Sequence, residues 1–174
     1  QKRIPFSIIQ KHETYLNEQL RHIDETAQLT IAGSYRRKKS TSGDIDVLLT
    51  TSQMKPSQLL KQFVQQLIKS EYLTETLSLG TKKFMGICQG SGDFSKRIDI
   101  MVTKPEEYPF AILYFTGSKD FNTKMRADML TRGLTLNEYA LKHSDTKEPV
   151  DHVFKTELDI FHYIKYDYVE PEDR

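Results

Sequence analysis

The 174-residue sequence has no tryptophan and a single cysteine, Cys88. One thiol cannot build an internal disulfide framework. The absence of such disulfides is typical of a chain that folds in a reducing compartment. Cys88 lies in an apolar, strand-like run, which favours a buried structural thiol over a nucleophile. No apolar run reaches the roughly 18–20 residues that a membrane-spanning helix needs, and no secretory signal opens the chain. We therefore expect an intracellular protein without a membrane partner.

Several enzyme motifs are also missing. The sequence has no Walker-type phosphate loop, no dinucleotide-binding fingerprint and no G-x-S-x-G nucleophile elbow. Its five histidines are scattered, and none has the spacing of a zinc ligand relative to Cys88. With 37% hydrophobic and 28% charged residues, the chain can still build the core of a soluble globular protein.

The net charge of +1 hides an uneven distribution. Residues 1–104 carry 16 Lys and Arg against 10 Asp and Glu, whereas residues 105–174 carry 9 against 14. A basic first part could face a polyanion such as nucleic acid. An uneven solvated surface would explain the same numbers.

Hydrophobic periodicity and turn signals predict alternating helices and strands. Helices are expected over residues 4–23, 34–39, 59–68, 109–115, 118–132 and 157–164. Strands are expected over residues 28–32, 44–50, 72–78, 82–89, 96–102 and 134–141, with a short one starting at Val150 and a tight connection over residues 90–93. The polar segment at residues 103–107 contains Pro105 and predicts a boundary between two parts of the chain.

The most informative stretch is residues 33–49, where a Gly33-Ser34 turn precedes an Asp-x-Asp pair that opens an apolar strand. Alternate strand residues share a face, so Asp44 and Asp46 project together and repel each other unless a cation lies between them. Mg²⁺ is the hard cation that accepts both carboxylate and phosphate oxygens, and a Gly-Ser turn that starts a helix binds anions. The pattern suggests metal-assisted phosphoryl or nucleotidyl transfer. By itself, an Asp-x-Asp pair more often marks a solvated strand edge.

A third carboxylate, Asp99, interrupts the alternating apolar run at residues 96–102. An unpaired buried Asp would cost several kcal/mol, so a purely structural role is hard to assign. Arg97 lies on the same strand face and could hydrogen-bond Asp99 and orient it. The alternative is an Arg–Asp pair with no metal.

Together these motifs resemble the nucleotidyltransferase core of the family X DNA polymerases. The motifs are Gly33-Ser34-x-Arg36-Arg37, residues 42–49, residues 76–86, Arg97-Ile98-Asp99-Ile100, residues 113–118, Met125-Arg126-Ala127, residues 136–139 and Asp159-Ile160-Phe161. The likeness runs from Lys2 to Pro171, and the Tyr-Phe-Thr-Gly-Ser stretch at residues 114–118 narrows it to family X.

The resemblance implies an α+β fold. Residues 1–104 would form a nucleotidyltransferase palm with a mixed, mainly antiparallel sheet and flanking helices, and residues 105–174 a small α/β nucleotide-binding subdomain. The family's lyase and helix-hairpin-helix modules would precede residue 1, so we expect either an excised catalytic half or a minimal natural protein. The resemblance also implies a monomer that works in the nucleus if the source is a eukaryote, with a mitochondrial or viral origin left open.

The implied activity is templated addition of a deoxynucleotide from a dNTP to the 3′-hydroxyl of primed or gapped DNA, in short-gap and base-excision repair. Asp44, Asp46 and Asp99 would hold two Mg²⁺ ions, with Mn²⁺ as an alternative ion. Asp99 would lie nearest the primer 3′-hydroxyl. A nucleotidyltransferase with another acceptor (RNA, a protein or a small molecule) and a degenerate nucleic-acid-binding module are the alternatives.

The resemblance also implies contacts to the nucleotide and the DNA. The β and γ phosphates would be bound by Ser34, Arg37, Ser42 and Gly43. The sugar would be flanked by Tyr114, Phe115 and Gly117, with Tyr114 as a gate against a ribose 2′-hydroxyl. Asn122 would reach the minor-groove edge of the incoming base, and Arg126 would contact the template strand. Read without the resemblance, Tyr114 and Phe115 could be core aromatics and Arg126 a solvated charge.

The chain departs from the family pattern at three positions. Lys119 stands where family members have an Asp beside the incoming base, and Thr123 replaces a Lys that contacts the templating base. Met101 replaces an Arg that helps to switch the metal-site aspartate, so gating by that route is in doubt. The short connection at residues 90–95 and the Tyr114-Phe115 pair favour templated over template-independent synthesis.

Overall fold

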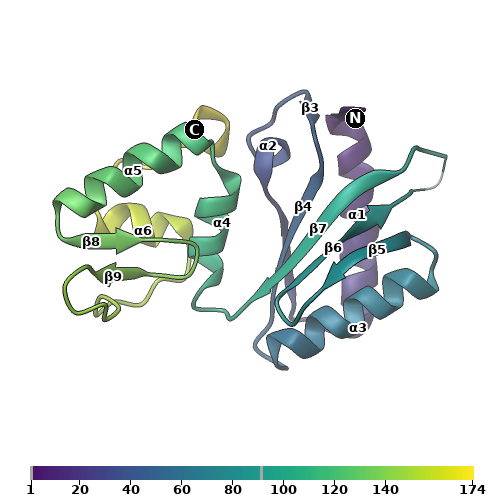
Figure 1. Ribbon diagram of the computed structural model, residues 1–174, viewed down its shortest axis with the longest axis horizontal. Helices are drawn as coiled ribbons and strands as arrows, with labels where there is room; N and C mark the ends of the chain where they lie inside the picture. The colour runs from purple at the N-terminus through teal and green to yellow at the C-terminus, as the bar shows by residue number, and fades with distance from the viewer. Residues whose placement is uncertain (1, 91) are drawn as a thin grey trace.

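The computed structural model describes residues 2–90 and 92–174. Two parts of the chain lie side by side (Figure 1), one built around a five-stranded sheet and the other mainly helical with a two-stranded sheet. Within the described residues, no helix is both long enough and apolar enough to cross a bilayer.

Helices and strands alternate along most of the chain. The helices are α1 Phe6–Ile23, α2 Gly33–Arg36, α3 Pro56–Lys69, α4 Tyr108–Thr116, α5 Lys119–Thr131 and α6 Glu157–Tyr163, followed by a 3₁₀ turn over Pro171–Asp173. The strands are β1 Ile4–Pro5, β2 Gln28–Ile31, β3 Thr41–Ser42, β4 Ile45–Thr50, β5 Leu73–Leu79, β6 Lys83–Cys88, β7 Lys96–Thr103, β8 Leu134–Leu136 and β9 Leu141–His143. The predicted α+β class is confirmed.

The central sheet has the strand order β2-β4-β7-β6-β5. Only the β4–β7 pair is parallel, and the other three neighbours are antiparallel, so the sheet is mixed and mainly antiparallel as expected. The β4–β7 register pairs Asp46 with Asp99. This register brings carboxylates from two distant segments to the same place on the sheet.

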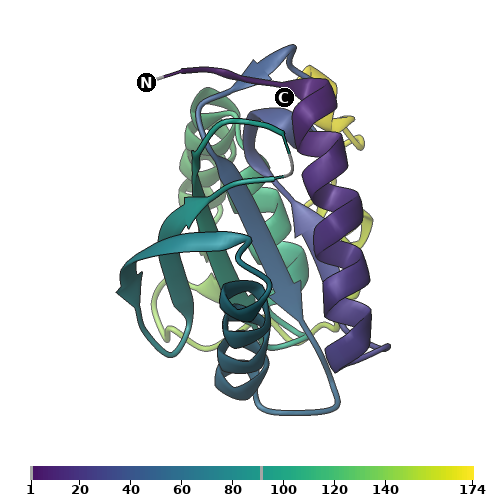
Figure 2. The same cartoon turned by 90° about the vertical axis from the view of Figure 1, so that its right-hand side faces the viewer.

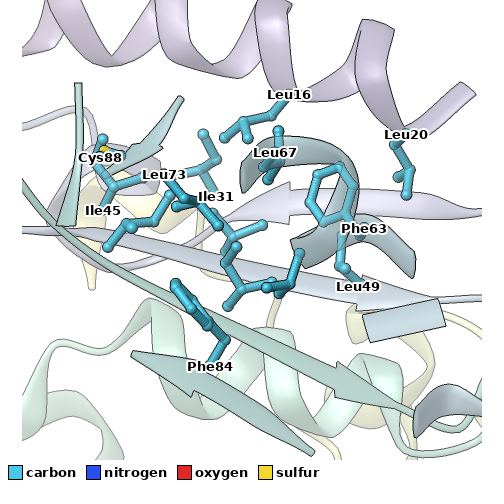
Figure 3. Close-up of a cluster of buried hydrophobic side chains, with 14 of the residues drawn as sticks. Leu16, Leu20, Ile31, Ile45, Leu49, Phe63, Leu67, Leu73, Phe84 and Cys88 are labelled. Atoms are coloured by element: carbon cyan, nitrogen blue, oxygen red, sulfur yellow. The ribbon is translucent and has the colours of Figure 1, made fainter. Parts of the chain in front are cut away.

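The main core lies between the sheet and the helices α1 and α3, which cover one face (Figure 2). Ile45, Val47 and Leu49 of β4 point into this core and are at most 1% exposed, with Phe63 of α3 among their neighbours (Figure 3). Because strand side chains alternate, Asp46 must point to the opposite face. Cys88 is buried in the same core, as predicted.

The second part of the chain has its own apolar cluster. This cluster is built from α4, α5, α6, the β8–β9 hairpin and the segments that follow. A third, smaller cluster packs Tyr108 and Ala111 of α4 against Ala32 and Leu48, on the face of the large sheet opposite to α1 and α3. Helix α4 therefore joins the two parts and lies on the face from which Asp46 projects.

Three predictions of secondary structure near the N-terminus need correction. Residues Ile4–Pro5 form β1, paired with β3, and α1 begins only at Phe6, because Pro5 has an extended backbone and Ile4 is drawn into the core. Helix α2 is a single turn that ends at Arg36, and Lys38 then adopts a positive φ of 60°. The strand predicted from Asp44 begins one residue later, at Ile45.

The strand predicted over residues 134–141 is also wrong. The segment forms one arm of a hairpin, β8, and then turns at Asn137, whose side-chain oxygen accepts hydrogen bonds from the amides of Tyr139 and Ala140. Asn favours such turns because its side chain competes with main-chain pairing. The strand expected from Val150 is absent from the described residues, where Pro149 makes only an isolated bridge to Lys142. Within the predicted connection at residues 90–93, Ser91 lies outside the described residues.

Candidate active site

Three carboxylates predicted to act together lie within reach of one another. Asp46 comes from β4, Asp99 from its parallel neighbour β7, and Asp44 directly precedes β4. One carboxylate oxygen from each lies within 4.8 Å of the others. Two segments more than fifty residues apart thus supply a compact set of hard oxygen donors, the kind that Mg²⁺ and Mn²⁺ prefer.

The cluster is strained electrostatically. Burial, followed by the charges of Asp44 and Asp99, raises the pKa of Asp46 to about 7. Burial and the Asp99 charge also raise the pKa of Asp44. Raised carboxyl pKa values mean that the ionised cluster is unfavourable unless a positive charge joins it. The donor set therefore fits a divalent cation.

Arg97 orients Asp99 as the strand pattern predicted. Its guanidinium donates to Asp99 Oδ1 at 2.7 Å and to the carbonyl of Gly86 at 3.2 Å. Arg97 bonds only one of the two carboxylate oxygens of Asp99, Oδ1. Because Arg97 also bonds Gly86, it fixes the Asp99 carboxylate relative to β6.

The Gly33-Ser34 turn sits directly against the carboxylates. Gly33 has a φ of +65°, and a Cβ at this position would lie 2.9 Å from Asp46 Oδ2. The amide of Ala32 donates to the carbonyl of Asp46 at 2.8 Å. A glycine is required here both for the backbone conformation and for the close approach. Ser34 follows at once, and its hydroxyl accepts a bond of 3.3 Å from Arg37.

The sequence interpretation missed Arg3 as part of this region. Arg3 donates to Thr41 through Nε at 3.2 Å and NH2 at 3.3 Å, and its NH1 lies 3.3 Å from where a Cβ of Gly43 would stand. The charges of Arg97, Arg3 and Lys83 offset part of the rise in the pKa of Asp44 that burial and the Asp99 charge cause. The β1–β3 pairing places Arg3 beside Ser42 and Gly43, and no local sequence pattern predicts that pairing.

The predicted sugar and base contacts gather at the end of α4. The rings of Tyr114 and Phe115 meet edge to face with centroids 4.9 Å apart. Asn122 of α5 donates from Nδ2 to the carbonyl of Tyr114 at 2.6 Å, and the Arg126 guanidinium lies 5.5 Å from the centre of the Tyr114 ring. Gly117 ends α4 with a φ of +70°.

Arg37, three residues after Ser34, connects the Gly33-Ser34 turn to the residues at the end of α4. Its NH1 donates to the carbonyl of Thr116 at 2.6 Å, and a Cβ on Gly117 would lie 3.0 Å from the same nitrogen. Arg37, one of the predicted phosphate residues, is thus a neighbour of Gly117, one of the predicted sugar residues, across the junction of the two parts.

A buried ion network beside Arg37 was not predicted. Glu157 of α6, 7% exposed, accepts paired bonds from Arg36 at 2.8 and 3.1 Å and from Arg174 at 2.6 and 3.2 Å. Burial works to raise the pKa of Glu157, but the hydrogen bonds from Arg174 and Arg36 outweigh it and hold that pKa below its usual range. The sequence predicted Glu157 only as the start of a helix, because nothing in the local sequence marks this residue as an ion-pair partner.

A carboxylate triad on one face of a mixed sheet whose other face is covered by two helices, with a Gly-Ser helical turn packed against the triad, defines the nucleotidyltransferase type of palm. The family model for the DNA polymerase beta palm matches residues 3–105, and that for the DNA polymerase beta thumb matches residues 111–174. The chain therefore belongs to the family X DNA polymerases, the family of DNA polymerase beta.

Individual relatives agree with the family match. DNA polymerase lambda of Rattus norvegicus is 35% identical over 82% of this chain and 28% of its own length. DNA polymerase lambda of Arabidopsis thaliana is 26% identical over 99% of this chain and 36% of its own length. The DNA polymerase/3'-5' exonuclease PolX of Bacillus subtilis is 25% identical over 99% and 29%, respectively. The chain thus spans between 28% and 36% of these relatives.

Proposed function

We propose that this chain is the catalytic region of a DNA-directed DNA polymerase. It would add a deoxynucleotide from a dNTP to the primer 3′-hydroxyl of primed or gapped DNA and release pyrophosphate. The observation that carries this proposal is the Asp44–Asp46–Asp99 cluster beside the Gly33-Ser34 turn. The family membership of the chain supports the same reaction.

In the proposed domain organisation, the palm comprises residues 1–104 and the nucleotide-binding subdomain residues 105–174. Separate apolar clusters in the two parts support this division. The relatives come from an animal, a plant and a bacterium. The proposed setting is that of an intracellular, monomeric enzyme of short-gap repair, which is nuclear in a eukaryote.

The three carboxylates are proposed to hold two Mg²⁺ ions, with Mn²⁺ as an alternative. Bound divalent ions would supply activation of the 3′-hydroxyl and neutralise charge on the departing pyrophosphate. The role of the chain itself is to present the oxygens in a fixed arrangement. Arg97 contributes by holding Asp99 in place through its 2.7 Å hydrogen bond.

The remaining residues are proposed to position the nucleotide and the DNA. Ser34, Arg37, Ser42 and Gly43 would bind the β and γ phosphates, and Arg3 joins this group because it lies against Gly43. Tyr114, Phe115 and Gly117 would flank the sugar, Asn122 would contact the base and Arg126 the template. The contacts of Asn122 and Arg126 with Tyr114 support a common location.

Replacing one carboxylate tests the reaction. Asp99→Ala should reduce Mg²⁺-dependent extension of a primed, gapped DNA by about 10²–10³-fold, because a metal ligand contributes several kcal/mol to the transition state. The exposed Asp151→Ala serves as the matched control and should extend at the parent rate. Primer extension by Asp99→Ala at the parent rate would overturn the metal assignment.

The same assay distinguishes other acceptors. Template-matched nucleotides should be incorporated far faster than mismatched ones. Nucleotide transfer to RNA, protein or a small molecule, without templated extension of DNA, would instead support a different nucleotidyltransferase. DNA binding with no transfer to any acceptor would support a degenerate binding module.

A further inference from the structure

Arg3 reaches the proposed phosphate site from beside a very short strand. It precedes β1, which has only the two residues Ile4–Pro5 and pairs with the equally short β3. A two-stranded pairing of this length has little stability by itself, so Arg3 needs support on both sides. On the side of β1 that support is Ile4, which is 1% exposed in the main core, and a 2.9 Å bond from the amide of Phe6 to the carbonyl of Ser40.

On its other side, the residue before Arg3 lies over an aromatic ring. The ammonium nitrogen of Lys2 is 4.4 Å from the centre of the Phe94 ring, which is within the range of a cation–π contact. Phe94 belongs to the connection between β6 and β7, far from Lys2 in the sequence. The ring therefore supports the side of Arg3 that β1 does not.

The Phe94 ring is itself held in place from the interior. It is partly buried and packs against the main core. The buried Lys96 ammonium lies 4.0 Å from the centre of the same ring and donates a hydrogen bond to the Phe94 carbonyl. Lys96 has no exposed side-chain surface and pairs with Asp93 at 2.6 Å. Because Asp93 fixes the buried ammonium, that ammonium fixes the ring on which Lys2 rests.

The guanidinium of Arg3 reaches across β3 to the phosphate site. Its Nε and NH2 donate to Thr41, and its NH1 lies 3.3 Å from where a Cβ of Gly43 would stand. A guanidinium binds phosphate oxygens as a planar fork, so its contribution depends on where that plane is held. If the guanidinium faces the site for only a fraction of the time, the apparent affinity for phosphate falls by the same fraction.

We propose that Phe94 is a positioning residue for the triphosphate, because it holds Arg3 against Gly43 through Lys2. The inference rests on the proposed function and adds to it a residue that acts without touching the nucleotide. When the ring is removed, the segment before β1 detaches from the β6–β7 connection. Arg3 then faces Gly43 less often, and the affinity for the phosphates falls. The carboxylate cluster keeps its arrangement.

The direct test is a calorimetric titration with inorganic triphosphate and Mg²⁺, which probes the phosphate site without a sugar or a base. Phe94→Leu keeps an apolar side chain against the core but removes the ring face. It should weaken binding by about two- to fivefold, the effect expected from losing an exposed cation–π contact. Phe94→Tyr keeps the ring and should bind like the parent chain.

Two results of this titration would count against the inference in different ways. Parent-like binding by Phe94→Leu would overturn the role of the ring and leave the proposed function standing. A parent chain without saturable triphosphate binding would overturn both.

A double-mutant cycle with Arg3 separates positioning from a general loss of structure. Arg3→Met should itself weaken triphosphate binding. Adding Phe94→Leu to it should cause little further loss, because no guanidinium is left to position. An effect of Phe94→Leu that is as large in the Arg3→Met background as in the parent would show that the ring acts by another route, which contradicts the proposal.

Primer extension provides a second readout. Phe94→Leu should raise the KM for dNTP by the factor that calorimetry measures and leave kcat unchanged, since it weakens binding equally in the ground state and the transition state. The exposed Asp151→Ala is the control and should match the parent in both assays. A fall in kcat with KM unmoved would contradict a positioning role at the phosphates.

Discussion

At the scale of single residues, Asp46 belongs both to the central strand β4 and to the carboxylate cluster. Its neighbours Ile45 and Val47 are buried on the opposite face, so alternation forces the carboxylate toward Asp99 and the Gly33 turn. The same burial raises its pKa to about 7. The fold therefore keeps a carboxylate in a place where its charge is unfavourable, which is typical of functional sites.

This environment predicts how Mg²⁺ and pH affect stability. The folded-state pKa of Asp46 lies above its unfolded value, so without metal the folded chain loses stability as the pH rises toward and through about 7. Mg²⁺ should offset this loss and raise the Tm at pH 8 more than at pH 5.5. Each kcal/mol that Mg²⁺ adds to the free energy of unfolding should raise the Tm by about 2–4 °C. Thermal unfolding with and without Mg²⁺ at both pH values measures the effect.

Asp46→Asn provides the comparison. This variant should melt higher than the parent at pH 8 without metal and should lose most of the Mg²⁺-induced increase in Tm. An equal Mg²⁺ effect in the parent and the variant would show that the carboxylate cluster does not bind the ion.

At the scale of elements, the connection between β6 and β7 is held by buried charges. Asp93 accepts bonds from Lys96 Nζ at 2.6 Å, His12 Nε2 at 3.0 Å and the amide of Gly90 at 3.0 Å. The Lys96 side chain has no exposed surface. His12 in turn contacts the Tyr72 hydroxyl at 2.6 Å, and burial lowers the pKa of His12. The connection is thereby fixed to α1 and to the start of β5.

Asp93→Ala should destabilise the chain by about 3–5 kcal/mol, because it leaves the buried Lys96 ammonium without a counter-charge. The double variant Asp93→Ala with Lys96→Met should recover much of that loss, since an apolar pair removes the buried charge altogether. Urea unfolding of the two variants beside the exposed control Asp151→Ala measures both effects. If the double variant is as unstable as the single one, the unpaired charge is not the cause.

At the scale of the whole molecule, Glu157 joins the two parts of the chain. It binds Arg36 from the sheet-bearing part and Arg174 from the end of the second part, with both pairs at short range. Arg174 also lies over the rings of Phe121, Phe161 and Tyr168. One buried carboxylate therefore links α2, α6 and the last turn of the chain.

Acid should weaken this link. The folded-state pKa of Glu157 lies below its unfolded value, so its stabilisation is present above about pH 4.5 and is lost as the pH falls through the folded-state value. Glu157→Gln should cost about 3 kcal/mol at pH 7 and much less at pH 3. Guanidinium unfolding at the two pH values tests this. A gap between parent and variant that is as wide at pH 3 as at pH 7 would rule out the ionised carboxylate as the source.

Most of the helices and strands and the carboxylate cluster could be predicted from the sequence, because they depend on short-range patterns, whereas the palm fold was expected from the resemblance to the family. Alternating apolar residues place Asp44 and Asp46 together, and the same alternation singles out Asp99. The Arg97–Asp99 bond joins residues two positions apart, so strand geometry alone predicts it. The hairpin at residues 134–143 was missed because the apolar residues on both sides of the turn were taken as one strand, although Asn137 is a turn signal and the alternation breaks at Glu138.

Only the tertiary structure decided which distant side chains meet. Arg3 and Thr41 are 38 residues apart, His12 and Asp93 are 81, and Arg36 and Glu157 are 121. Local periodicity reports which face a residue takes on its own helix or strand, whereas these contacts depend on strand register and on the path of the chain between elements. The sequence by itself therefore determined the α+β architecture and the three carboxylates. The packing of α4 against the sheet decided that Arg37 and Asn122 meet at one helix end.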